Sequence, residues 1–145
     1  MTFDIKFVPA VAFTRSVNPK CETRRRQTKL VRVNGAIVER PSGWSPEAIH
    51  MKKYIRVMKE RKWCRACWGR CGRDQFGWVR ITGIRTEAFA KMPRNAPQRE
   101  GTDMALDDFK LLGCFRGMGS ESKNTVFVFE YVALGLMNPY PLQDI

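Results

Sequence analysis

Residues 124–134 read "NTVFVFEYVAL", a run in which β-branched and aromatic residues follow one another almost without interruption. Such residues favour β-strands, and a nearly continuous apolar run is typical of a strand that is buried on both faces. This stretch therefore predicts a long strand at the centre of a sheet. A second strand is predicted at residues 77–87, "GWVRITGIRTE", with Val79 and Ile81 on its buried side.

Further strands are predicted in the first forty residues. The alternation in "FDIKFV" (3–8) favours a strand, and Pro9 then suits the start of a short helix. Asn34 and Gly35 separate two short β-runs in "KLVRVNGAIVER" (29–40), and this dipeptide indicates a tight hairpin because both turn positions need a positive φ. Strands with helices packed around them indicate an α+β domain, built on a small curled β-sheet or β-barrel.

Three helices are predicted after residue 40. Ser45 is a favourable N-cap, Pro46 suits the first turn, and Glu47 suits the positive end of the helix dipole, so a helix is expected to begin there. Apolar residues recur along it at helical spacing and cations occupy its other surfaces, which makes it amphipathic and basic. "TEAFAKM" (86–92) predicts a short helix before a proline, and "TDMALDDFKLLGCF" (102–115) predicts a capped helix.

The positive charge of the chain is concentrated in its first half. Of the net charge of +12, residues 1–73 carry 18 Lys and Arg against 5 Asp and Glu, whereas residues 74–145 carry 8 against 9. A basic half favours a polyanionic partner, because bound phosphates release counterions; a solvated basic surface is the alternative. The side chains predicted to contact nucleic acid are Arg24, Arg25 and Arg26 in "NPKCETRRRQTK" (18–29), and Lys52, Lys53 and Arg56 on the basic helix.

Length and composition predict the class of protein. A chain of 145 residues fits a single domain, 1–145, with its own hydrophobic core. No apolar run is long enough to span a membrane, and the N-terminal residues make a poor signal peptide. With five cysteines and no export signal, the thiols are expected to be reduced and the protein to be soluble and cytoplasmic.

Cys64, Cys67 and Cys71 form a cluster in "WCRACWGRCGRD" (63–74). Two thiolates at Cys-x-x-Cys spacing can reach one tetrahedral ion from a tight turn, so zinc is a candidate ligand of these three residues. A fourth ligand is missing from the segment, and His50 or another cysteine would have to approach in space. The alternative is that the thiols bind no metal, and nothing else in the sequence requires a cofactor.

Conventional catalytic patterns are missing from the sequence. The single histidine, His50, is not accompanied by a Gly-x-Ser-x-Gly stretch, and there is no Gly-rich phosphate loop. Any catalysis would therefore use lysine, threonine, cysteine or carboxylate side chains. Lys20 lies close in sequence to the three arginines, and neighbouring cations lower the pKa of a lysine toward neutrality.

Four segments together resemble one family. "NPKCETRRR" (18–26) resembles the Lys-x-x-Thr-x-Arg signature of ASCH domains, which belong to the PUA-like superfamily and include phage-encoded members. "WVRITGIRTEAFAKM" (78–92), "NAPQREGTDMALDDFKLL" (95–112) and "TVFVFEYVAL" (125–134) resemble the family's strand and short helix, its Glu-Gly segment with the following helix, and its closing strand. The resemblance implies a β-barrel-like fold with a cleft and a role linked to RNA.

The resemblance also implies candidate catalytic residues. One branch of the family consists of amidohydrolases that deacylate acetylcytidine, and their lysine, threonine and glutamate fall on Lys20, Thr23 and Glu100. This chain departs from the pattern at Asn18-Pro19, where glycine is usual, and at Cys21, where threonine is common. Residues 41–76, with the basic helix and the cysteines, are predicted to be an insertion, which puts free acetylcytidine in doubt as the substrate.

Three functions follow from these patterns. A binding module would hold a base of RNA or other nucleic acid, or a modified nucleoside, in the cleft, and the charge asymmetry favours this class. An enzyme would deacylate a modified cytidine with Thr23 as nucleophile or substrate-binding hydroxyl and with Lys20 as general base or activating cation. Glu100 would orient Lys20 or carry a proton to the leaving amine, and another branch of the family implies a ribonuclease. The third class is a phage protein that acts on a nucleic-acid-handling host enzyme. The oligomeric state is not predicted.

Overall fold

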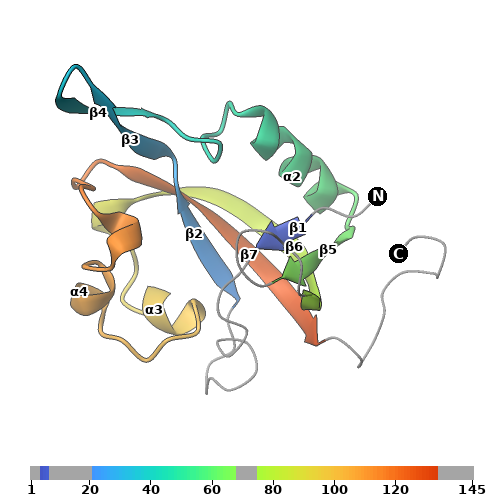
Figure 1. Ribbon diagram of the computed structural model, residues 1–145. Coiled ribbons are helices and arrows are strands. Elements are labelled where there is room, and N and C mark those ends of the chain that lie inside the picture. Colours follow the sequence, from blue (N-terminus) through green and yellow to red (C-terminus); the bar gives the residue numbers. More distant parts are fainter. Residues whose placement is uncertain (1–3, 7–20, 68–74, 134–145) are drawn as a thin grey trace.

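The protein is built on one five-stranded sheet, seen in a computed structural model that describes residues 4–6, 21–67 and 75–133 (Figure 1). Across the sheet, the strands follow the order β1 (Asp4–Lys6), β5 (Trp63–Cys67), β6 (Gln75–Ala88), β7 (Lys123–Ala133) and β2 (Glu22–Arg26). Strands β1 and β5 run parallel, and the other neighbours run antiparallel.

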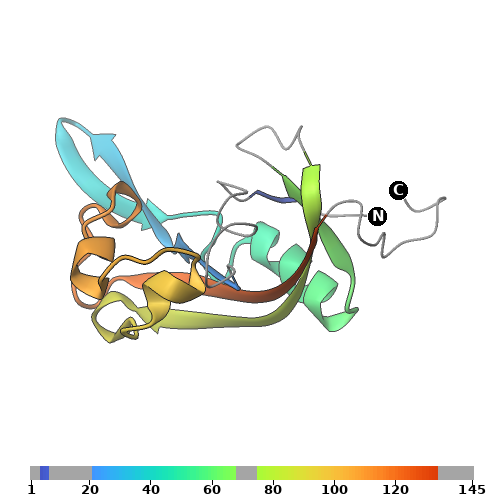
Figure 2. The ribbon, with the colours of Figure 1, turned by 90° about the horizontal axis from the view of Figure 1, so that it is seen from below.

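The sheet is strongly curled. The long strands β6 and β7 bend together along their length (Figure 2), and their register shifts between Ile81 and Gly83, where a bulge adds to the bend. The predicted α+β class with a curled sheet is confirmed. The predicted central strand is also confirmed, because β7 lies between β6 and β2 and buries Val126, Phe127 and Phe129.

The main core lies between the sheet and the helix α2 (Ile49–Lys59). Met51, Tyr54 and Val57 are the buried side chains of this helix, and they recur at intervals of three because one helix face meets the sheet. Buried side chains of β5, β6 and β7 complete the cluster: Cys64, Ala66, Val79, Ile81, Phe127 and Phe129. Much of this core comes from residues 41–76, so the segment predicted as an insertion is part of the central packing.

A second, smaller cluster closes the other end of the sheet. It is formed around two short helices, α3 (Ala96–Arg99) and α4 (Leu106–Phe109), and two 3-10 turns, η1 (Phe89–Lys91) and η2 (Gly113–Phe115). Its buried members are Met92, Ala96, Phe109 and Phe115. Figures 1 and 2 both place these elements on the side of β2 away from α2.

A separate two-stranded hairpin, β3 (Thr28–Val33) and β4 (Ala36–Pro41), projects from the body of the protein (Figures 1 and 2). Asn34 and Gly35 form its turn with φ angles of 50° and 80°, which confirms the hairpin predicted from this dipeptide. Its two strands pair only with each other among the described strands.

The structure corrects the predicted start of the basic helix. The helix begins at Ile49 rather than after Ser45, and its N-cap, Ala48, has no side-chain capping bond. Ser45 is buried, and its backbone N–H donates to the Ser42 carbonyl at 3.2 Å. The segment 42–48 therefore forms successive turns. These turns bring Trp44 back onto the core before the helix starts.

Three other predicted elements differ from the structure. Residues 63–67 form the strand β5 rather than a tight turn, because they pair with β6 in the sheet. The predicted helix at 86–92 is a 3-10 turn over Phe89–Lys91, and its first residues continue β6. The predicted helix at 102–115 is only α4 and η2. The strand predicted at 3–8 is described over Asp4–Lys6, and the helix predicted after Pro9 lies outside the described residues.

Within the described residues, no helix combines the length and the apolar character that crossing a membrane requires.

Candidate functional site

The strand β2 carries the arginine run along one edge of the sheet. Successive side chains of a strand point to opposite faces, so Glu22 and Arg24 share one face and Thr23 and Arg25 share the other. The edge of β2 is fastened to α3 because the Cys21 N–H donates to the Arg99 carbonyl at 2.8 Å. The sequence "CETRRR" therefore presents ionic groups to two different surroundings.

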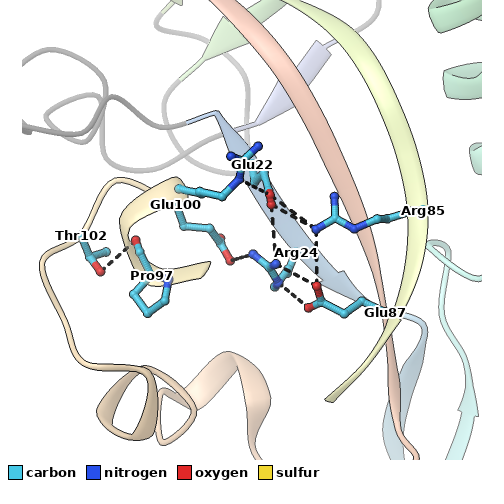
Figure 3. A network of polar contacts seen from close by, with 8 residues as sticks. Glu22, Arg24, Arg85, Glu87, Pro97, Glu100 and Thr102 are labelled. Atoms are coloured by element: carbon cyan, nitrogen blue, oxygen red, sulfur yellow. Dashed lines mark hydrogen bonds and ion pairs between the residues drawn. The ribbon is translucent and has the colours of Figure 1, made fainter. Parts of the chain in front are cut away.

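On the first face, three arginines and three glutamates form one ionic network (Figure 3). The fully covered Arg24 guanidinium contacts Glu87 at 2.7 and 3.0 Å and Glu100 at 3.2 Å. The buried Glu22 carboxylate accepts hydrogen bonds from Arg99 at 2.7 Å and from Arg85 at 3.1 Å. Opposite charges are equal in number within this network, which is the condition under which buried charges are tolerated.

The network shifts the pKa values of its members. Burial alone would raise the pKa of Glu22, but hydrogen bonds from Arg99 and Arg85 outweigh it and hold that pKa below its ordinary value. Burial likewise opposes the charge of Arg24, yet the carboxylates, Glu87 above all, raise its pKa. Arg25, on the other face of β2, has a lowered pKa, because burial lowers this pKa more than Glu100 raises it.

Replacing Glu22 with glutamine is expected to flatten the loss of stability at acid pH. Because the folded-state pKa of Glu22 is depressed, its ionisation stabilises the fold above the ordinary value of 4.5, and this contribution is lost as the pH falls through the folded-state pKa. Urea unfolding at a series of pH values between about 7 and 3 measures the free energy of unfolding of both proteins. If this free energy falls as steeply with pH in Glu22→Gln as in the wild type, Glu22 is excluded as the source of the acid-induced loss of stability.

A cleft of about 470 Å³ opens beside β2, where the hairpin, the 42–44 turn and η2 approach one another. Its volume lies within the range of small-molecule sites in proteins. Within the described part of the chain, every charged residue that lines it is a cation: Arg24, Arg25, Arg26, Lys29 and Arg116. Arg24 also belongs to the ionic network, so the network forms part of the cleft wall. The guanidinium of Arg24 is already bound by the carboxylates of the network.

The cleft is also lined by buried polar atoms that lack hydrogen-bond partners among the described residues. Asn124 is 0% exposed, and both Oδ1 and Nδ2 of its side chain are unsatisfied. Thr28 Oγ1 and Arg26 Nε are also buried and lack hydrogen-bond partners among the described residues. Since a buried amide without partners costs about 1–3 kcal/mol, such atoms at the wall of a cleft indicate a polar ligand.

Trp44 and Arg25 form a stacked wall of the same cleft. The Arg25 guanidinium lies over the indole ring at 5.7 Å from its centroid, and Tyr54 stacks on this indole with ring centroids 5.7 Å apart. The turn is fixed by two hydrogen bonds, from Thr125 Oγ1 to the Trp44 carbonyl at 2.6 Å and from the Trp44 N–H to Ser42 Oγ at 3.1 Å. The wall is therefore planar, cationic and firmly held.

Two of the three predicted catalytic residues, Thr23 and Glu100, are described by the structure, and they lie on adjoining segments. Thr23 is on β2 with 1% of its surface exposed, and Glu100 follows α3 and binds Arg24. Lys20 lies outside the described residues. The structure thus brings the segment of Glu100 to the strand of Thr23, and the catalytic roles stay predictions.

The predicted nucleic-acid contacts separate into three groups. Arg24 is buried in the ionic network, so we assign it a structural role in place of a surface contact. Arg25 and Arg26 line the cleft, where the Arg26 guanidinium also donates to the Arg116 carbonyl. The three α2 cations, Lys52, Lys53 and Arg56, are exposed on the helix face away from the core, and their role stays a prediction.

The structure gives no support to the predicted zinc site. Cys64 is buried in the main core among apolar side chains, and Cys67 ends β5. Cys71 lies outside the described residues. Among residues 4–6, 21–67 and 75–133, no group of three or more His, Cys, Asp or Glu side chains is placed to hold a metal ion.

Sequence reasoning did not identify Glu22, Trp44, Asn124 or Arg116 as site residues. Asn124 had a detectable signal, because it is an amide at the start of an otherwise apolar strand, where burial without a partner is costly. Glu22 is a lone acid within a basic run, a pattern that indicates local charge pairing.

No family model and no curated protein sequence matches this chain. Among solved structures, the chain is similar to the crystal structure of protein EF3133 from Enterococcus faecalis V583, which is described under the family DUF984. The TM-score is 0.45 and the identity 13%, over 86% of this chain and 66% of that chain, so the match spans slightly less than two thirds of the other protein. The likeness concerns the path of the chain and carries no argument about function, and membership of the ASCH family stays a prediction.

Proposed function

We propose that this protein binds nucleic acid and holds one base in the cleft beside β2. The observation that carries the proposal is the Asn124 side chain, a fully buried amide that lines a cationic cleft with its donor and acceptor unsatisfied among the described residues. An amide offers a donor and an acceptor side by side, which is the pattern that nucleobase edges complement.

The walls of the cleft supply the other contacts that a nucleotide needs. A flat base can stack on the Arg25 guanidinium, which already rests on the Trp44 indole, because bases stack on arginine planes as well as on aromatic rings. Phosphates can be held by the cations Arg26, Lys29 and Arg116 at the rim. The resemblance of residues 18–26 to the ASCH signature and the basic first half of the chain support the same function.

Binding rather than hydrolysis is the function that we propose. A threonine nucleophile must reach its substrate, but the described residues that line the cleft include Asn124 and not Thr23. The Glu100 carboxylate binds the Arg24 guanidinium at 3.2 Å, so it already takes part in the ionic network.

Removing two rim cations is expected to weaken binding and its dependence on salt. The double variant Lys29→Ala, Arg116→Ala should bind a labelled single-stranded RNA of about 12 nucleotides less tightly, and the slope of log K against log salt should fall by about 2. Fluorescence anisotropy over a range of NaCl concentrations measures both quantities. The variant Lys52→Ala, Lys53→Ala tests the helix face of α2 in the same assay.

The matched control removes the same charge from two exposed positions, the last residue of η1 and a residue between η1 and α3, as Lys91→Ala, Arg94→Ala. Its salt slope should equal that of the wild type, which separates local contacts from a general effect of net charge. Wild-type protein that binds neither RNA nor single-stranded DNA at low salt would refute the proposed function.

A further inference from the structure

We propose that the β3–β4 hairpin is a second contact surface, which holds the nucleotides that flank the base in the cleft. The ligand would then be a polynucleotide strand and not a free nucleoside or nucleotide. This inference rests on the proposed function and extends it by naming the class of ligand.

The hairpin is built to project from the body of the protein. Its strands pair only with each other among the described strands, and both ribbon views show it standing clear of the sheet (Figures 1 and 2). A two-stranded hairpin is marginally stable alone in water. This one is anchored at its base, where Ser42 Oγ donates to the Arg26 carbonyl at 2.6 Å and the Ser42 N–H donates to the Gln27 carbonyl at 2.9 Å.

One face of the hairpin continues the wall of the cleft. Directly opposed residues of an antiparallel pair lie on the same face, and the register places Leu30 opposite Glu39 and Arg32 opposite Ile37. Leu30 lines the cleft. Arg32 and Ile37 therefore follow it on the same face, one step farther toward the exposed tip.

The composition of the hairpin fits a nucleic-acid strand. Its cations Lys29, Arg32 and Arg40 are exposed, and its one carboxylate, Glu39, lies 3.9 Å from Arg26 in an ion pair. Ile37 is 64% exposed and Leu30 42%, although each lies beside a charged residue. Lys29 and Arg40 oppose each other on the other face, so Arg32 is the cation that alternates with Leu30 and Ile37 on the face that continues the cleft. A cation beside exposed apolar side chains suits phosphates and the apolar faces of sugars and bases, and the charged residues that the described part of the chain places along the cleft are all cations.

The experiment compares a mononucleotide with an oligonucleotide that contains the same base. Wild-type protein, the double variant Arg32→Gln, Ile37→Ser and the single variant Arg32→Gln are titrated with each by calorimetry. Oligonucleotide affinity should fall about tenfold in the double variant, and the salt slope should fall by about 1 in both variants. Mononucleotide affinity should stay within about twofold, because the cleft itself is unchanged.

The control variant Arg94→Gln, Leu111→Ser removes a charge and an exposed apolar side chain from other exposed positions. Unchanged oligonucleotide affinity in the hairpin variants, with mononucleotide still bound, would overturn the hairpin inference alone. Wild-type protein that binds neither ligand would refute the proposed function itself. Hairpin variants that change the oligomeric state in light scattering, with oligonucleotide affinity unchanged, would make the hairpin a protein interface and overturn the inference. The single Arg32→Gln variant keeps the test valid if the double variant unfolds.

Discussion

Replacing Arg24 with methionine should destabilise the folded protein by about 3–5 kcal/mol. The guanidinium is fully covered and contacts Glu87, Glu100 and, at 3.6 Å, Glu22. Methionine fills a similar volume but leaves these carboxylates without their shared cation, and two of them are almost fully buried. Removing one partner of a buried ionic group costs more than the ion pair itself contributes, because the remaining charges stay desolvated.

Urea unfolding of Arg24→Met against Arg80→Met measures this effect. Arg80 pairs with Glu130 at 2.9 Å, but both side chains are partly exposed, so the loss of this pair is expected to cost no more than about 1 kcal/mol. The difference between the two variants should shrink as the pH falls through the depressed pKa of Glu22, to which the charge of Arg24 contributes. Equal destabilisation by both substitutions would show that the network is not a buried structural unit.

Replacing Asn124 with leucine should weaken nucleic-acid binding by about 5- to 150-fold while leaving the free protein at least as stable as the wild type. The loss follows from the 1–3 kcal/mol that a bidentate amide contact to a base is worth. The stability follows because the substitution removes a buried amide that lacks partners among the described residues and fills its place with an apolar side chain. A residue that only holds the fold together would behave in the opposite way.

The same exchange at Asn95 is the matched control for Asn124→Leu. Asn95 precedes α3, is exposed, and makes no capping bond with its side chain, so Asn95→Leu should change neither binding nor stability appreciably. Thermal unfolding and anisotropy titration of both variants give the two quantities. Unchanged affinity in Asn124→Leu, or a loss of stability by several kcal/mol, would remove Asn124 from the binding site.

The sequence pattern predicted those elements whose structure depends mainly on the residues within the same segment. The apolar run at 124–134 and the alternation at 77–87 are strands because their side chains must be buried on one or both faces. Asn34-Gly35 makes a hairpin because few residues accept its φ angles. The start of α2 was mispredicted because tertiary packing of Trp44 outweighed the capping preference of Ser45.

The candidate site was less predictable because it is assembled from distant parts of the chain. The cleft joins residues 24–30, 42–44, 113–116 and 124, and none of these segments shows by itself that the others lie next to it. The arginine run was found as a basic patch, but strand alternation divides it. One face places Arg24 among carboxylates, and the other places Arg25 against Trp44. Only the fold shows which arginine is committed to structure.

The most direct test of base recognition at Asn124 is an NMR titration of its side-chain amide. The two Nδ2 proton resonances can be assigned by their loss in Asn124→Leu, and single-stranded RNA is then added to saturation. If a base binds in the cleft, these resonances should shift and saturate along the same curve as the anisotropy signal. Resonances that stay in place while the RNA saturates the protein would contradict the proposal, because the bound base would then lie elsewhere.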